Sequence, residues 1–466
     1  MNVWTTIVAI LVPFAAMWLL LRAVQRESGI SAGIERVGAG LALSIGVTSV
    51  TFFLWRMVGG SVDRYQRVET ALFALVAFAL MFRRVSASSA PSFKAPPEPK
   101  VLRAVAAVGL FILVVAFILF ARERFNAAPH GEWDAWAMWN MRAAFVAAPT
   151  EHWADGFTLA LVYAPPDYPL LLPASIARLW TLDGQWSTAA PVWFASIVAL
   201  ATILLVTGSL LRITGTLGAT LGLAILLVPG YAWYVTSQCA DAVLALFIIM
   251  AVTMLIAPEN PGRLVVAGAA AGFAAWTKNE GLVAALAIPI LFVIVSAPTT
   301  PREALVRRAA FLAAGLAPVL AVLGLFKLTL APPSELLTGI AQSGPMDKLL
   351  DVTRHKLVAS YMLGHFAEWG RWTVTSPLWF ALGWLALGAW NVRRVPVAAI
   401  VGAGTLVSML IAYYLVYILT AHDLMWHLHT SWARLISQMW PALAWTAAAS
   451  GLAPLIRSER ERASIR

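Results

Sequence analysis

The sequence has almost no cysteine and little charge. Cys239 is the single cysteine in 466 residues, which excludes an intrachain disulfide and a cysteine-rich metal site. Only 12% of the residues are charged, whereas a soluble domain typically has about 25%. No His-Glu-x-x-His stretch is present, so the usual helical zinc motif of metalloproteases is missing. These absences argue against an ordinary soluble domain.

Apolar residues dominate instead, at 60% of the chain, and the mean hydropathy is +0.78. Several apolar runs reach the ~18 residues needed to cross a bilayer, which predicts an all-α, polytopic transmembrane helical bundle. We expect about 13 spans from such runs. They lie near 3–22, 36–55, 67–82, 102–120, 191–211, 216–231, 241–257, 264–277, 282–297, 309–330, 374–391, 397–419 and 436–455.

The net charge of +10 does not indicate nucleic acid, because the basic residues lie mostly in short loops between apolar runs. If the spans alternate, the basic segments share one side, which the positive-inside rule assigns to the cytoplasm. These segments are 83–103, 210–214, 261–263, 301–308, 391–395 and 456–466. The first apolar run has no basic n-region, so we expect a span and not a cleaved signal. The prediction is a multi-pass inner-membrane protein with its N-terminus outside and its C-terminus in the cytoplasm.

The Pro- and Ser-rich loop 83–103 is the best candidate boundary along the chain. We therefore divide the chain into three N-terminal helices with a linker (1–100), a core (101–330) and a C-terminal part (331–466). The core includes a long outer loop, 121–190.

Alternation places all the unusual polar segments on the outer side, beginning with 130–145, "HGEWDAWAMWNMRAAF". This stretch combines acids, a base and indoles: Glu132, Trp133, Asp134, Trp136, Trp139 and Arg142. Tryptophans at a membrane surface commonly form aromatic belts. An acid there usually needs a partner or a function, because its desolvation is costly.

A second acid, Asp167, follows two prolines that restrict the backbone, and Tyr168 comes next. The apolar run after them is too short to span, so we expect a helix at the membrane interface. Asp167 could cap that helix. Asp241 could likewise cap the span that it opens, while Lys278 and Glu280 occupy a tight hairpin.

The segment 422–441 holds His427, His429 and Arg434. The two histidines are two residues apart, so they diverge on a helix and do not suit zinc. Arg434 suits a phosphate better, because a guanidinium binds phosphate through paired hydrogen bonds.

Taken together, the order and sidedness of these motifs resemble the GT-C superfamily of integral-membrane glycosyltransferases. The nearest likeness is to bacterial enzymes that use lipid-phosphate sugars, related to protein mannosyltransferases and aminoarabinose transferases. The resemblance covers roughly residues 102–300 by motif and the rest by topology.

The resemblance implies transfer of a sugar from a polyprenyl-phosphate carrier to an acceptor on the outer face, with inversion. Its general base corresponds to Asp134, with Glu132 as the alternative, which spacing alone does not decide. Asp241 and Lys278 match the family pattern, whereas Asp167 matches only loosely. The donor-binding set that we predict is Trp133, Trp136, Arg142, Asp167, Tyr168, Asp241, Lys278, Glu280, His427, His429 and Arg434.

The physical chemistry of the reaction fits these residue types. A base must take the acceptor's proton, and cations must stabilise the leaving phosphate. We expect no obligatory cofactor, although the acids could hold a divalent cation. The expected partners are the polyprenyl-phosphate sugar, membrane lipids, and a lipid, glycan or protein acceptor.

Two other functions remain open. A ligase or polymerase using a diphosphate-linked oligosaccharide would rely on basic residues in an outer loop. Loop 331–373 has such residues: Lys348, Arg354, His355, Lys356 and Arg371. A transporter or flippase would place charges near the bilayer midplane, and Lys327 could lie there.

Overall fold

The computed structural model describes the chain except residues 1–2, 26, 83–97, 149–150, 162–163, 185, 371–375, 377, 391 and 465–466. The side chains of residues 3–6, 151, 183 and 453–464 are also outside the description. Most of the predicted linker, Arg371 and the side chains of the basic tail therefore lie outside the described residues.

The described residues form helices and no strand, which confirms the all-α prediction. The first half contains α1 (Val3–Gln25), α2 (Ile30–Met57), α3 (Val62–Met81), α4 (Lys100–Ala127), η1 (Ala135–Asn140), α5 (Met141–Ala147), η2 (Glu151–Phe157), α6 (Leu171–Asp183), α7 (Ala189–Leu226) and α8 (Pro229–Thr236). The second half contains α9 (Ala240–Met254), α10 (Pro261–Thr277), α11 (Gly281–Ser296), α12 (Arg302–Thr329), α13 (Glu335–Gln342), α14 (Pro345–Leu350), α15 (Val352–Glu368), α16 (Leu378–Trp390), η3 (Val392–Arg394), α17 (Val397–Leu419) and α18 (Leu424–Ser464).

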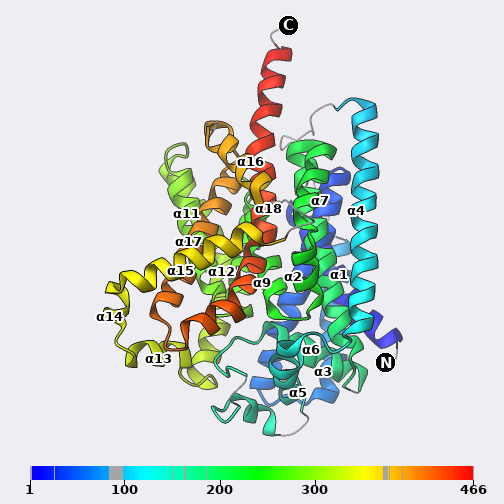
Figure 1. The fold of residues 1–466 in the computed structure, drawn as a ribbon. Coiled ribbons are helices and arrows are strands. Elements are labelled where there is room, and N and C mark those ends of the chain that lie inside the picture. Colours follow the sequence, from blue (N-terminus) through cyan, green and yellow to red (C-terminus); the bar gives the residue numbers. More distant parts are fainter. Residues whose placement is uncertain are drawn as a thin grey trace.

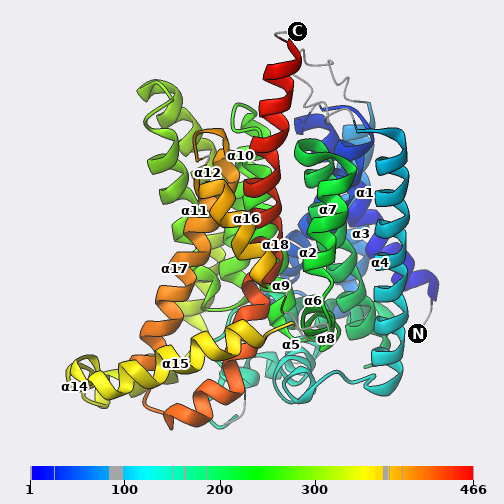
Figure 2. The same ribbon diagram turned by 45° about the horizontal axis from the view of Figure 1, so that its top comes forward.

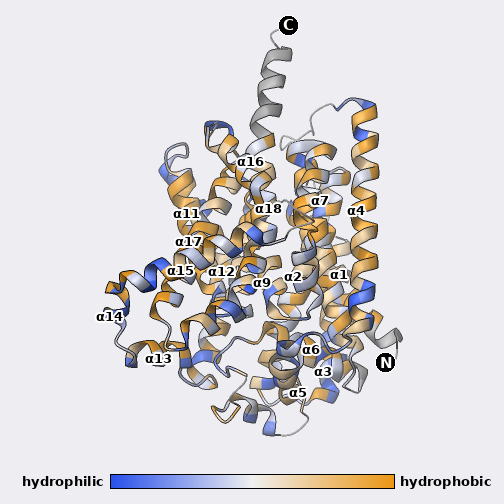
Figure 3. Ribbon diagram, in the orientation of Figure 1, coloured by the Kyte–Doolittle hydropathy of each residue, from blue (hydrophilic) through white to orange (hydrophobic). Residues whose placement is uncertain are grey.

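Long apolar helices make this a membrane protein. Within the described ranges, six helices are long and apolar enough to cross a bilayer, or seven if the bent pair α8 and α9 forms one span. Helix α4 shows the character most clearly, because its apolar side chains, such as Phe111, face outward. Figure 3 shows α4 as hydrophobic between hydrophilic ends. The larger count of about 13 spans stays a prediction.

Several element boundaries differ from the sequence prediction. The predicted span 191–211 and most of the predicted span 216–231 belong to α7, which is broken where Gly215 has a φ of 77°, and the end of the second span reaches into α8. The predicted loop 331–373 contains α13, α14 and α15, and α18 begins at Leu424, well before the predicted 436. The apolar run after Asp167 forms α6, which neighbours cover on nearly every side and which is not an exposed interfacial helix.

The elements that carry the candidate site gather toward one end of the bundle. Figure 1 shows α5, α6 and α13 at the bottom, opposite the C-terminal end of α18 and the start of α4. Helix α15 contacts α17 and α18, and it runs across them in Figures 1 and 2.

A buried ionic network, which we call the tie, fastens the N-terminal helices to the rest of the bundle. Glu35 of α2 pairs with Arg212 of α7 and Arg263 of α10, each at 2.6 Å. Glu27 pairs with the same two arginines, at 2.7 and 3.2 Å. Close backbone packing accompanies the tie, because a Cβ on Gly208 of α7 would lie 2.3 Å from the backbone nitrogen of Glu35. The N-terminal helices are therefore packed into the bundle.

Candidate active site

The tight turn between α10 and α11 places Lys278 and Glu280 inside the protein. Lys278 ends α10 in an extended conformation, and α11 begins only three residues later. Gly281 permits this close return, because a Cβ there would lie 1.9 Å from the carbonyl oxygen of Ala274. Lys278 is buried, Glu280 is partly buried, and Nζ of Lys278 lies 3.1 Å from Oε1 of Glu280.

Asp241 is the buried centre of the charges. Its Oδ1 accepts hydrogen bonds from Lys278 Nζ at 3.0 Å and from Gln438 Nε2 at 2.6 Å. Its Oδ2 accepts from Nε and Nη2 of Arg434, both at 3.3 Å. Cys239 and not Asp241 is the N-cap residue of α9, and Asp241 lies in the first turn of that helix. Its carboxylate instead joins α10 to α18.

Asp134 reaches the same cluster from the first loop through an ion pair with Arg434. The loop is held against the break between α8 and α9, because Glu132 N donates to Ser237 O at 3.1 Å. Gly131 makes this approach possible: its φ is 74°, and a Cβ would lie 2.6 Å from Ser237 O. A single turn of π-helix, η1, follows Asp134, and such turns are frequent at functional sites.

Asp167 forms a second polar group with residues from the α10–α11 turn and α12. Its Oδ2 accepts a hydrogen bond from Asn279 Nδ2 at 2.8 Å and lies 3.6 Å from Lys327 Nζ. Lys327 also donates to Asn279 Oδ1 at 2.8 Å and to the backbone carbonyl of Asp167. Because Leu170 is the N-cap of α6 and no side chain bonds to that end, Asp167 is not a helix cap.

Arg142 holds the backbone of the segment around Asp167 in place. It is buried, and its Nη2 donates to the carbonyl oxygens of Tyr168 at 2.7 Å and Pro166 at 3.4 Å. Burial lowers the pKa of Arg142 to about 10, so it stays charged at neutral pH. The ring of Tyr168 then stacks on Trp139 with centroids 5.8 Å apart. The negative charge of Glu280 and burial raise the pKa of Tyr168.

The charges border one cavity of about 330 Å³, within the range of small-molecule sites. Six of the predicted site residues line it: Asp167, Tyr168, Lys278, Glu280, His427 and Arg434. Burial lowers the pKa of Lys278, but the charges of Asp241 and Glu280 raise it by more, so the ammonium persists. The cavity therefore offers fixed cations beside carboxylates.

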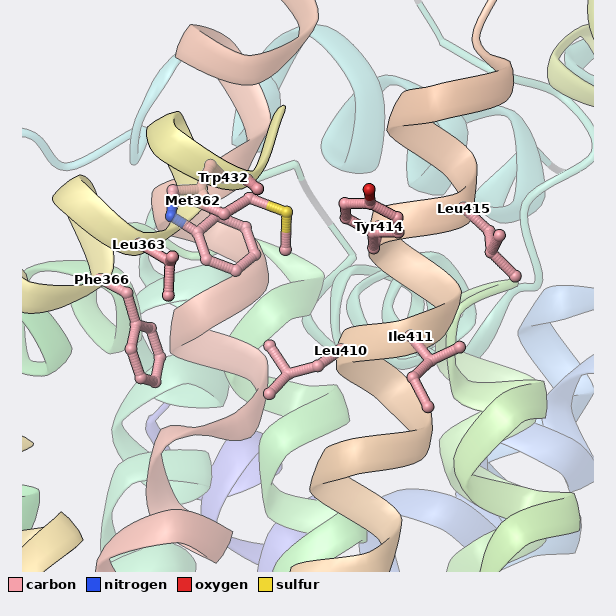
Figure 4. A pocket seen from close by; sticks show the side chains of 9 residues that line it. Met362, Leu363, Phe366, Leu410, Ile411, Tyr414, Leu415 and Trp432 are labelled. Atoms are coloured by element: carbon pink, nitrogen blue, oxygen red, sulfur yellow. The ribbon is translucent and has the colours of Figure 1, made fainter. Parts of the chain in front are cut away.

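An apolar groove of about 420 Å³ lies on the neighbouring face of α17 and α18. Figure 4 shows its walls: Met362, Leu363 and Phe366 from α15, Leu410, Ile411, Tyr414 and Leu415 from α17, and Trp432 from α18. Tyr413 and Tyr417, on the same helix α17, line the polar cavity. A polar cavity and an apolar groove thus share one pair of helices.

Other predicted residues lie away from the cavity. Glu132 pairs with Arg124, whose guanidinium lies 3.4 Å from the Trp233 ring centroid. Trp133 and Trp136 contact each other edge to face and are about half exposed. His429 accepts or donates a 2.9 Å hydrogen bond with the hydroxyl of Tyr361.

Sequence reasoning omitted Asn279 and Gln438 from the site and left Lys327 without a role in it. A signal existed for two of them. Gln438 follows Arg434 by four residues, which puts both on one helix face. Lys327 is an ionisable residue within a long apolar run, a general sign of function.

Among the described residues, no three or more His, Cys, Asp or Glu side chains form a group able to hold a metal ion. His427 lies in the first turns of α18, outside the predicted membrane span 436–455. Burial and the neighbouring His422 lower the pKa of His427 to about 4, so it is neutral at pH 7. A chelator experiment tests whether a divalent cation takes part.

Comparison with models of known protein families, with curated proteins and with solved structures gave no match to this chain.

Proposed function

We propose that the protein is an inverting glycosyltransferase, which moves a sugar from a polyprenyl-phosphate carrier to an acceptor hydroxyl. The observation that carries the proposal is the convergence of Lys278, Arg434 and Glu280 on one cavity. These residues come from two segments far apart in the sequence. Fixed cations suit a leaving phosphate, and a carboxylate suits proton abstraction.

The apolar groove beside the cavity supports a lipid-linked donor. Its lining is apolar apart from single polar atoms of Tyr414 and Trp432. An isoprenoid chain could lie along α17 while its phosphate reaches Lys278 and Arg434. Tyr168, whose ring stacks on the buried Trp139, brings an aromatic side chain to the cavity wall, and sugar rings commonly pack on aromatic rings.

We further propose that the cavity opens on the outer face of the inner membrane, with the C-terminus in the cytoplasm. The basic segments predicted to be cytoplasmic include the start of α4 and the C-terminal end of α18. In Figure 1 both ends lie opposite α5, α6 and α13. In this orientation the transfer serves glycan assembly in the cell envelope.

The ligase alternative relied on the basic residues of the loop 331–373. Lys348 instead donates to the carbonyl of Thr420 at 2.7 Å, and Arg354 donates to that of Ile418 at 2.6 Å. Both cations cap the C-terminal end of α17, where helix carbonyls lack partners. This observation favours the carboxylate-containing cavity over the loop as the reacting centre.

The test is a transfer assay with purified protein and a panel of polyprenyl-phosphate hexoses and pentoses, with and without chelator. We expect a covalent sugar–acceptor product that mass spectrometry detects with at least one donor. Flux of the lipid-linked sugar across sealed vesicles without any product would instead support a transporter.

A further inference from the structure

Glu280 differs from the other acids at the cavity in its hydrogen bonding. Oε1 lies 3.1 Å from Lys278 Nζ, but Oε2 is shielded from solvent and accepts no hydrogen bond from any described residue. A buried carboxylate oxygen without a donor is costly, so such an atom calls for a partner from outside the chain. Because the Glu280 side chain lines the cavity, rotation of its carboxylate would present Oε2 to a donor on a bound molecule.

The neighbouring aspartates already have hydrogen-bond or ion-pair partners within the protein. Both oxygens of Asp241 accept hydrogen bonds from side chains of the cluster. Asp167 is held by Asn279 and Lys327. Asp134 pairs with Arg434 and does not line the cavity, while Glu335 lines it but is exposed to solvent.

We propose that Glu280 is the general base of the transfer, an inference that rests on the proposed function. The acceptor hydroxyl donates its hydrogen bond to Oε2. As the acceptor oxygen forms its bond to the anomeric carbon, the bond between that carbon and the phosphate oxygen breaks. The electron pair leaves with the phosphate, the proton moves to Oε2, and the anomeric configuration inverts.

Lys278 takes part both in the proton transfer to Glu280 and in the departure of the phosphate. Its ammonium contacts both Glu280 and Asp241, so it holds the carboxylate of the base in place before transfer. As the proton arrives on Glu280, the ammonium becomes free to neutralise the phosphate. Asp134 then has a different task from the one the family resemblance implies: it orients the guanidinium of Arg434.

The test compares Glu280→Gln with Asp134→Asn in the full-length protein in detergent. The glutamine side chain has the same shape as glutamate, but its amide cannot accept the proton. We therefore expect the rate of sugar transfer by the Gln variant to fall by roughly 100-fold or more. Its affinity for farnesyl phosphate, a probe of the leaving group alone, should be retained or increased because a negative charge is removed. Asp134→Asn should weaken farnesyl phosphate binding first.

The matched control is Glu123→Gln on the exposed end of α4, which should leave both readouts unchanged. Glu280→Asp, which withdraws the carboxylate by one methylene, should keep part of the transfer activity. If the Gln variant does not fold, this variant tests the assignment of Glu280 as the base. Transfer by Glu280→Gln at the wild-type rate would overturn the assignment of Glu280 only. Absence of transfer by the wild-type protein with every donor would refute the proposed function itself.

Discussion

The tie and the candidate active site are two buried clusters of similar charges with different surroundings. In the tie, Glu35 lies between Arg212 and Arg263, and all three side chains are buried. In the candidate site, Asp241 lies between Lys278 and Arg434 in a similar way. The two cations of the second arrangement line a cavity of about 330 Å³.

The difference shows that ion pairs alone do not mark a functional site. A cation surrounded by fixed carboxylates stabilises a helix junction, and breaking such a pair is costly. A cation that also faces an open cavity can transfer part of its interaction to a ligand. We therefore expect substitutions in the tie to affect stability and those at the cavity to affect binding and turnover.

The largest expected contrast is in accessibility. Cysteines introduced at Ser334, which lines the cavity, and at the exposed Glu259, which lies in the α9–α10 turn near the tie, probe the two clusters. The native Cys239 is buried and should react little. In intact cells, a membrane-impermeant maleimide should label Ser334→Cys and not Glu259→Cys. Labelling in the reverse order would contradict the proposed orientation.

In the tie, Glu35→Gln should lower the free energy of unfolding by about 3–5 kcal/mol, because two buried guanidiniums lose their shared carboxylate. Thermal unfolding in detergent measures the effect. Glu27→Gln is the control, and its smaller effect follows from its partial exposure. An unchanged melting temperature for Glu35→Gln would show that the tie is not structural.

At the floor of the site, Arg142→Met should cost about 1–3 kcal/mol of stability, since the carbonyls of Pro166 and Tyr168 lose their donor. Turnover should fall with it, because the segment that carries Asp167 loosens. The exposed Arg122→Gln serves as the control. Equal stability of both variants would argue that Arg142 does not fix the segment.

The smallest expected effect is a pH dependence from His427. Its pKa is about 4 in the folded protein and about 6.5 when unfolded, so the unfolded chain binds more protons between these values. Stability should therefore fall as the pH drops from about 6.5 toward 4. His427→Gln should flatten this slope in melting curves, and an identical slope would exclude His427 as its source.

The sequence predicted the helical class and most of the residues that meet at the cavity. Membrane sidedness alone brought Asp134, Asp241, Lys278 and Arg434 to one face, and the structure joins them in one cluster. The roles of these four residues in the reaction stay predictions.

The pairing within that face was not predictable, because it depends on side-chain directions across helices. Loop position did not distinguish Asp134, which pairs with Arg434, from Glu132, which pairs with Arg124. The cover over α6 and the break in α7 at Gly215 likewise come from tertiary packing and one backbone angle. The apolar composition of these segments predicts neither the burial of α6 nor the break in α7.

The most direct measurement is the affinity of farnesyl phosphate for the wild-type protein and for Lys278→Met, by titration calorimetry in detergent. Losing a charged hydrogen-bond donor costs about 1.5–3 kcal/mol, which corresponds to roughly 10–100-fold weaker binding. Arg434→Gln, at a less buried position, provides a second variant should Lys278→Met not fold. Saturable wild-type binding that both variants weaken is the predicted result. Absence of binding, or equal affinity in all three proteins, would contradict the phosphate site and with it the proposed reaction.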